Sequence, residues 1–96
     1  MRVQVLDEAT RDLADGYRFY EHQSEGLGDY FLDSIWSDIN SLRLYAGIHA
    51  AYLGYHRLLS KRFPFAVYYR IEDRIIRVCA VLDCRRNPEW IAERLR

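Results

Sequence analysis

Apolar residues recur every three or four positions along two segments of the first half of the chain, the spacing of one face of an α-helix. The first helix is expected to begin after Asp7, whose side chain is suited to cap it, and to end at Gly26. A second helix follows at once and fades near Tyr45, so the two form a helical hairpin, with Gly16 expected to permit a close helix contact. The apolar stripes are Ala9, Leu13, Tyr17 and Tyr20 in the first helix and Leu27, Phe31, Ile35, Ile39 and Leu42 in the second.

The second half of the chain changes to a period of two, which is typical of β-strands. Strands are expected over 65–71 and 76–82, joined by a turn at Glu72-Asp73, with shorter strands over 55–59 and 3–6. Pro88 is suited to a first helical turn and is expected to begin a short helix ending near Leu95. In the last strand, strict alternation would place Ile76, Val78, Ala80 and Leu82 on one face and Ile75, Arg77, Cys79 and Val81 on the other.

The resulting order, βααβββα, predicts an α+β fold with a small antiparallel sheet, the helical hairpin packed on one face and a short C-terminal helix. With 96 residues, of which 50% are hydrophobic, residues 1–96 are expected to form a single domain. Two cysteines close together do not make a disulfide scaffold, and the charged N-terminus is unlike a signal peptide, so a cytoplasmic protein is expected.

Charge is unevenly distributed along the chain, although 14 basic side chains balance 14 acidic ones. The first 50 residues carry four basic and nine acidic side chains, whereas the last 46 carry ten basic and five acidic. Zero net charge argues against binding nucleic acid mainly through its phosphates. The basic half is a possible surface for an anionic partner, and the acidic half is better explained as exposed helix faces that keep the protein soluble.

Few reactive constellations are present in the sequence. The three histidines and two cysteines lack metal-ligand spacing, and the nucleophile elbow, P-loop and dinucleotide motifs are missing, so neither metal nor cofactor is expected. A ribonuclease would need cations on the transition-state phosphate, and Arg57, Lys61 and Arg85 are the candidates for that chemistry. Arginine on an exposed strand is also ordinary solvated surface.

Six short motifs, in this order and spanning nearly the whole chain, closely resemble the ParE/RelE superfamily of bacterial type II toxins. The resemblance implies a βααβββα toxin, of the kind often labelled a plasmid stabilisation system, that is held inactive by a cognate antitoxin. The motifs are Ala9-x-x-Asp12-Leu13, Phe19-Tyr20-Glu21, Gly26-Leu27-Gly28-x-x-Phe31, Tyr55-His56-Arg57, Arg62-Phe63-Pro64-Phe65-x-Val67-Tyr68-Tyr69 and Val81-Leu82-Asp83-x-Arg85-Arg86-Asn87-Pro88.

The superfamily has two functional branches. The RelE branch cleaves mRNA on the ribosome, but Ala66 stands where its middle-strand arginine would lie, Ile91 stands near its tail tyrosine, and only Arg85 matches. The resemblance therefore favours the ParE branch, whose members poison DNA gyrase and are not known to be enzymes. Gyrase and an antitoxin are the expected partners. The chain is not expected to bind a membrane or to recognise a nucleic-acid sequence directly. A toxin-like fold that only binds an antitoxin is a third interpretation.

Aromatic and arginine side chains supply the candidate binding residues. Tyr17, Tyr20, Tyr30 and Trp36 are expected to contact a helix of the antitoxin along the helical hairpin, with an extended antitoxin segment on the sheet, although core filling would explain the same aromatics. Arg85, Arg86 and Trp90 are expected to contact the target. In the alternative interpretation of this tail, Asp83 pairs with one of the arginines and Trp90 docks the last helix on the sheet edge.

Overall fold

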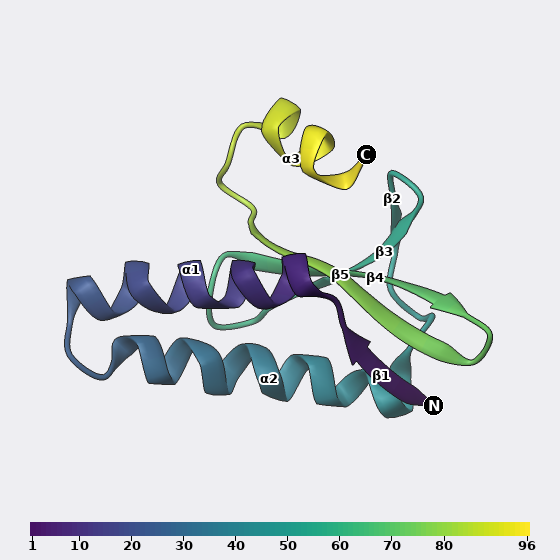
Figure 1. Ribbon diagram of the computed structural model, residues 1–96, viewed down its shortest axis with the longest axis horizontal. Coiled ribbons are helices and arrows are strands. Elements are labelled where there is room, and N and C mark those ends of the chain that lie inside the picture. The colour runs from purple at the N-terminus through teal and green to yellow at the C-terminus, as the bar shows by residue number, and fades with distance from the viewer.

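Two antiparallel helices form one layer of the molecule (Figure 1). The computed structural model describes residues 1–96, and the helices are α1 (Asp7–Gln23) and α2 (Leu27–Tyr45). The turn between them uses Gly26 with φ of 88°, a left-handed conformation that glycine adopts without strain, as expected. The start of α1 differs from expectation, because Leu6 occupies the N-cap position and Asp7 is already helical. Asp7 and Glu8 instead stabilise the helix N-terminus through its dipole.

The sheet is mixed rather than purely antiparallel, while the α+β fold class is confirmed. Its strand order is β1-β5-β4-β3-β2, in which β1 runs parallel to β5 and all other pairs are antiparallel. Between β1 and β5 the chain runs through the helical hairpin and then through β2, β3 and β4, so no single crossover joins this parallel pair. The strands are β1 (Arg2–Val5), β2 (Ala51–Tyr52), β3 (Tyr55–Leu59), β4 (Phe65–Glu72) and β5 (Ile75–Asp83), of which β2 was not anticipated.

A β-bulge at Cys79 overturns the expected alternation along β5. Tyr68 pairs with Ala80 and Tyr69 pairs with Val78, so Cys79 is an extra residue without a partner on β4. The bulge reverses which face later side chains occupy. Val81 therefore joins Ile76 and Val78 in the larger core cluster, whereas Ala80 and Leu82 lie in the smaller one.

The β4–β5 turn also lies one residue later than expected. Its two central residues are Asp73 and Arg74, with φ of 53° and 64°. Positive φ at both positions is the pattern of a type I′ turn, which matches the twist of the strands it joins. Neither residue is glycine or asparagine, which is why the sequence did not locate the turn correctly.

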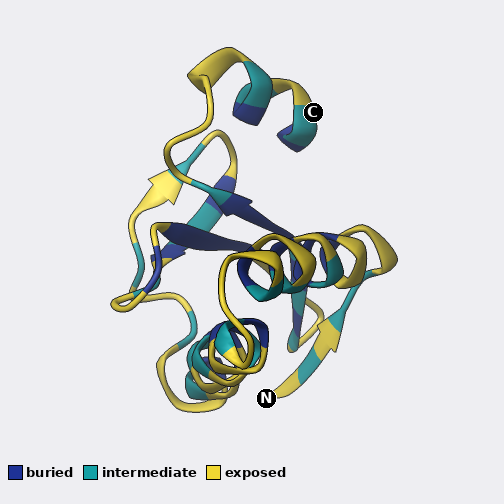
Figure 2. Ribbon diagram, turned by 90° about the vertical axis from the view of Figure 1, so that its left-hand side faces the viewer, coloured by how far each residue is buried: buried dark blue, intermediate teal, exposed yellow.

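The sheet lies between two helical layers (Figure 2). The hairpin covers one face and buries Phe31, Ile35 and Ile39 against Val67 and Tyr69 of β4. The helix α3 (Pro88–Leu95) covers the other face, where it forms the smaller core cluster. The side chains of this cluster are Tyr55, Ala66, Tyr68, Ala80, Leu82, Ile91 and Leu95.

Polar contacts attach α3 to the rest of the molecule. Asp12 of α1 is 7% exposed and accepts two hydrogen bonds from the Arg94 guanidinium, each 2.9 Å long. Asp12 also accepts a 3.0 Å hydrogen bond from the backbone N–H of Val81, so one carboxylate joins α1, β5 and α3. Tyr55 donates from its hydroxyl to the carbonyl of Leu95, and Asn87 caps the start of the helix by accepting from the N–H of Glu89.

A Gly16→Ala substitution is expected to lower the free energy of unfolding by about 1–3 kcal/mol, because it overpacks the interface between the two helices. A Cβ at this position would lie 2.5 Å and 2.6 Å from ring atoms of Phe31, which is fully buried. Urea denaturation measures the change. Thr10→Ala, at an exposed position of the same helix, is the control, and equal stability of the two variants would contradict the tight contact.

Candidate partner-binding surfaces

A groove of about 820 Å³ runs between α2 and the segment that contains β3 and the β3–β4 loop. Tyr30 lines one end of the groove, and Tyr45 and Ile48 line it near the C-terminal end of α2. Leu59 lies on the β3 side. These four apolar side chains are between 45% and 74% exposed, although side chains of this size are usually buried. Apolar residues gathered in a groove are typical of a protein-binding surface.

The two walls of the groove differ in charge. Asp33 and Asp38 lie on the α2 side, and Lys61 and Arg62 lie on the β3–β4 loop. Burial raises the pKa of Asp38, and the nearby charges of Lys61 and Arg62 oppose that rise. The Arg62 guanidinium also lies 5.7 Å from the centre of the Tyr30 ring. An amphipathic segment with charges of both signs would complement these walls.

Three rings from different segments support the loop that closes one end of the groove. The Tyr69 hydroxyl of β4 accepts a 2.9 Å hydrogen bond from the N–H of Gly47 and is hydrogen-bonded to His49 Nδ1. The His56 ring of β3 stacks on Tyr69, and its Nδ1 lies 3.1 Å from the carbonyl oxygen of His49. Burial lowers the pKa of His49, and the charge of His56 lowers it further.

The lowered pKa of His49 is expected to make the stability of the protein depend on pH. Its folded-state pKa is depressed, so below about pH 6.5 the unfolded chain binds a proton that the folded chain does not. Stability is therefore fully present above this pH and decreases as the pH falls. Chemical denaturation between pH 7.5 and about 5 should show a shallower decrease for His49→Asn than for the parent chain.

His22→Asn provides the control for this measurement, because His22 is exposed on α1. It is expected to retain most of the parent's pH dependence. A His49→Asn profile that is parallel to the parent's would show that His49 does not titrate in this range.

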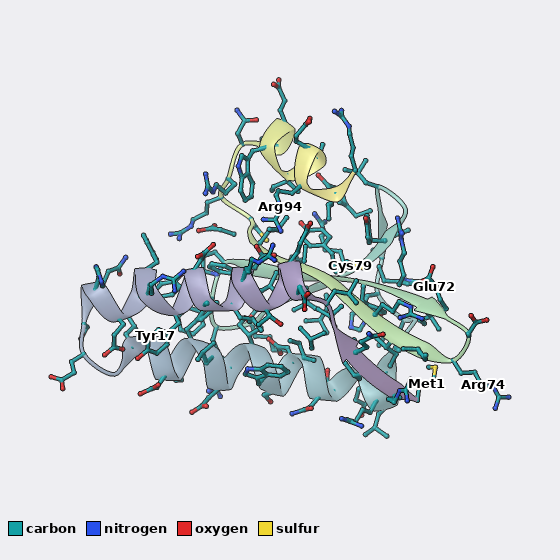
Figure 3. All side chains as sticks on the ribbon, in the orientation of Figure 1. Met1, Tyr17, Glu72, Arg74, Cys79 and Arg94 are labelled. Atoms are coloured by element: carbon teal, nitrogen blue, oxygen red, sulfur yellow. The ribbon has the colours of Figure 1, made fainter.

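The tail after β5 forms a second surface against α1. Arg85 donates two side-chain hydrogen bonds to Asp83, of 3.0 Å and 2.7 Å, and these hold the pKa of Asp83 below its usual range. The Arg86 guanidinium instead lies over the Trp90 ring, 4.0 Å from its centre. The Arg94 guanidinium lies 5.6 Å from the centre of the same ring (Figure 3). A cavity of about 430 Å³ separates this tail from α1.

The four aromatic residues that the sequence singled out do not share one surface. Tyr30 lines the groove, and Trp36 is 41% exposed on α2 but does not line it. Tyr17 fills the space beside Gly28, between the two helices (Figure 3). Tyr20 is 7% exposed and packs among the aromatic rings of the core.

Sequence reasoning missed other residues of the groove. Ile48 lies in a segment interpreted only as a connecting loop, and Leu59 lies in a strand whose neighbours were unknown. The one sequence signal for these groove residues was that they are large apolar side chains at positions outside both helical stripes.

The three candidate ribonuclease residues also lie apart. Arg57 is stacked on Tyr52 and approaches the hydroxyl of Tyr68, in the cluster under α3. Lys61 lines the groove beside α2. Arg85 approaches the hydroxyl of Tyr20, which belongs to the core under the hairpin. Of four clefts on the surface, one is lined by Lys61, and none of the four is lined by Arg57 or Arg85.

No cluster of three or more histidine, cysteine, aspartate or glutamate side chains is arranged to ligate a metal. None of the helices combines the length and apolar character needed to cross a bilayer. Both cysteines are free thiols.

Comparison with known proteins supports the fold. Neither a protein-family model nor a curated protein matches the sequence. Among solved structures, a chain of the chromosomal ParDE toxin–antitoxin system from P. aeruginosa superposes with a TM-score of 0.72 and 19% sequence identity. The match covers 84% of this chain and 92% of that one. The fold that the sequence motifs implied is therefore also the fold of a chain from a ParDE system.

Proposed function

We propose that this chain is the toxin of a type II toxin–antitoxin pair and that a cognate antitoxin neutralises it. The groove beside α2 is the observation that carries the proposal, because it exposes four large apolar side chains between walls of opposite charge. The similarity in fold to a chain of a ParDE system supports the same proposal. An antitoxin segment that folds on binding would cover these side chains.

DNA gyrase is the proposed target, reached in the cytoplasm. A ribonuclease would need converging cations, and Arg57, Lys61 and Arg85 lie on different surfaces. Ala66 is fully buried and carries no charge at the strand position where the RelE branch has an arginine. Gyrase poisoning requires no such catalytic set. The tail surface with Arg86 and Trp90 is the proposed contact with the target, and Arg85 contributes mainly by ordering the loop through Asp83.

Inducible expression with two parallel assays tests this function. Expression is expected to arrest growth, and the purified chain is expected to inhibit supercoiling by gyrase while leaving mRNA intact on programmed ribosomes. Co-expression of the product of the neighbouring reading frame should restore growth. Codon-specific mRNA cleavage that is lost in Arg85→Ala would assign the chain to the ribonuclease branch instead. A folded chain that binds the neighbour's product without arresting growth would identify an antitoxin-binding relic.

A further inference from the structure

The cavity between α1 and the tail combines apolar walls with charged groups. Phe19 of α1, Phe65 of β4 and Trp90 of α3 provide its aromatic lining. Phe19 is 51% exposed, and its ring packs edge-on against Tyr20, with 5.0 Å between ring centres. The cavity therefore offers a solvent-accessible aromatic side chain on α1 and a partly buried indole on α3.

Nearly all charged side chains around this cavity are paired within the chain. Asp12 binds Arg94, and the distance between Asp12 Oδ1 and Arg94 Nη1 is 2.9 Å. Asp15 binds Arg18, and Asp83 binds Arg85. These pairs leave the three carboxylates of the cavity with cationic partners of their own.

Arg86 is the exception. Its side chain takes part in none of the molecule's salt bridges or side-chain hydrogen bonds. Its guanidinium lies 4.0 Å from the centre of the Trp90 ring, and stacking on an aromatic ring restricts the guanidinium without using its N–H donors. An unpaired guanidinium held in one orientation is well suited to bind a carboxylate through two parallel hydrogen bonds.

We propose that this cavity binds an acidic–apolar segment of the target protein. A carboxylate of that segment pairs with Arg86, and a neighbouring apolar side chain packs between Phe19 and Trp90. The inference rests on the proposed function, because it assigns a chemistry to the target at the tail surface. It also adds Phe19 of α1 to a surface otherwise built from the tail.

A protein segment fits this cavity better than a nucleic acid does. Three carboxylates, those of Asp12, Asp15 and Asp83, line the cavity beside the two guanidinium groups of Arg86 and Arg94. A phosphate backbone carries a charge at every nucleotide and would need several free cations, whereas Arg86 is the only unpaired one that lines this cavity. A segment with one or two carboxylates beside apolar side chains matches the single free cation and the aromatic walls.

Trp90 fluorescence provides a direct test. Trp36→Phe leaves Trp90 as the only tryptophan of the chain. The probe is a blocked peptide of sequence Gly-Asp-Leu-Phe-Asp-Gly, compared with the same peptide carrying Asn in place of both Asp residues. The acidic peptide is expected to change Trp90 emission saturably and to bind at least about tenfold more tightly than the neutral peptide, because a bidentate charged pair is lost in the latter.

Variants identify the groups that bind the peptide. Arg86→Gln should weaken binding of the acidic peptide at least about tenfold and remove its preference over the neutral one. Phe19→Ala should weaken both peptides. Arg43→Gln is the matched control, because Arg43 is an exposed arginine without a salt bridge, lies in the last turn of α2 and is outside the cavity, so it should leave binding unchanged.

The inference would be overturned if Trp90 emission showed no saturable response or if the two peptides bound with equal affinity. It would also be overturned if Arg86→Gln bound the acidic peptide as tightly as the parent, or if a thymidine decamer bound more tightly than the acidic peptide. Failure of the proposed function can be distinguished from failure of this inference. If the chain binds the peptide through Arg86 but never arrests growth, only the proposed function is contradicted. Growth arrest that persists undiminished in Arg86→Gln would overturn the role of this cavity in target binding.

Discussion

Asp12→Ala is expected to lower the free energy of unfolding by about 3 kcal/mol, the largest effect on stability anticipated for a polar residue of this chain. The substitution removes the partner of the Arg94 guanidinium and the acceptor for the Val81 N–H. Breaking a buried ion pair by deleting one member costs about 3–5 kcal/mol, and the lower end applies because the Arg94 side chain is 26% exposed and can regain water. Chemical denaturation followed by circular dichroism measures the loss.

Asp15→Ala is a closely matched control. Asp15 lies three residues further along the same helix, but its pair with Arg18 is 70% and 64% exposed. Both substitutions gain the same helix propensity, so the difference between the variants isolates the buried contacts. The control should stay within about 0.5 kcal/mol of the parent once that gain is considered. Equal stability of the two variants would show that Asp12 does not anchor α3.

Ile48→Glu combined with Leu59→Glu is expected to raise the dissociation constant of the proposed antitoxin complex at least about 100-fold. Both side chains line the groove beside α2, and they are 74% and 57% exposed. Covering a carboxylate with a partner's apolar face is unfavourable, and the apolar contact is lost as well. Titration calorimetry with the product of the neighbouring reading frame measures the affinity.

The stability of this double variant should remain close to that of the parent, because both positions are mostly exposed. Leu44→Glu supplies the control, since Leu44 is 81% exposed on α2 and does not line the groove. Unchanged affinity of the groove variant, or an equal loss in Leu44→Glu, would place the antitoxin elsewhere.

Periodicity predicted most elements of this fold because each element buries one regular face. The stripes of α1 and α2 and the alternation along β4 are local patterns, and local patterns can be recognised without knowing the partner surface. The parallel pairing of β1 could not be predicted in this way, because it joins segments that lie far apart in the chain. The bulge at Cys79 was equally invisible, since one inserted residue changes the register without changing composition.

The candidate surfaces were less accessible to sequence reasoning than the fold. Residue type identified Arg86 and Trp90, but only the structure distinguishes Arg86, which is unpaired, from Arg85, which binds Asp83. Residue type did not separate Tyr20 in the core from Tyr30 in the groove, because large aromatic residues serve both purposes. Exposure depends on how the layers assemble, and the apolar lining of the groove comes from three segments, namely α2, the loop after it and β3.

The pairing of β1 with β5 also has a consequence for how the chain folds during its synthesis. Val3 pairs with Ile76, and Asp12 pairs with Arg94, which lies 82 residues further along the chain. Such non-local contacts form slowly because a long loop must close before they contribute. The helical hairpin is translated long before β4 and β5, so its apolar stripe remains uncovered on the ribosome until the central strands have emerged. A nascent chain is therefore expected to be a better substrate for chaperones than the folded protein, and native structure should appear only after residue 94 has been translated.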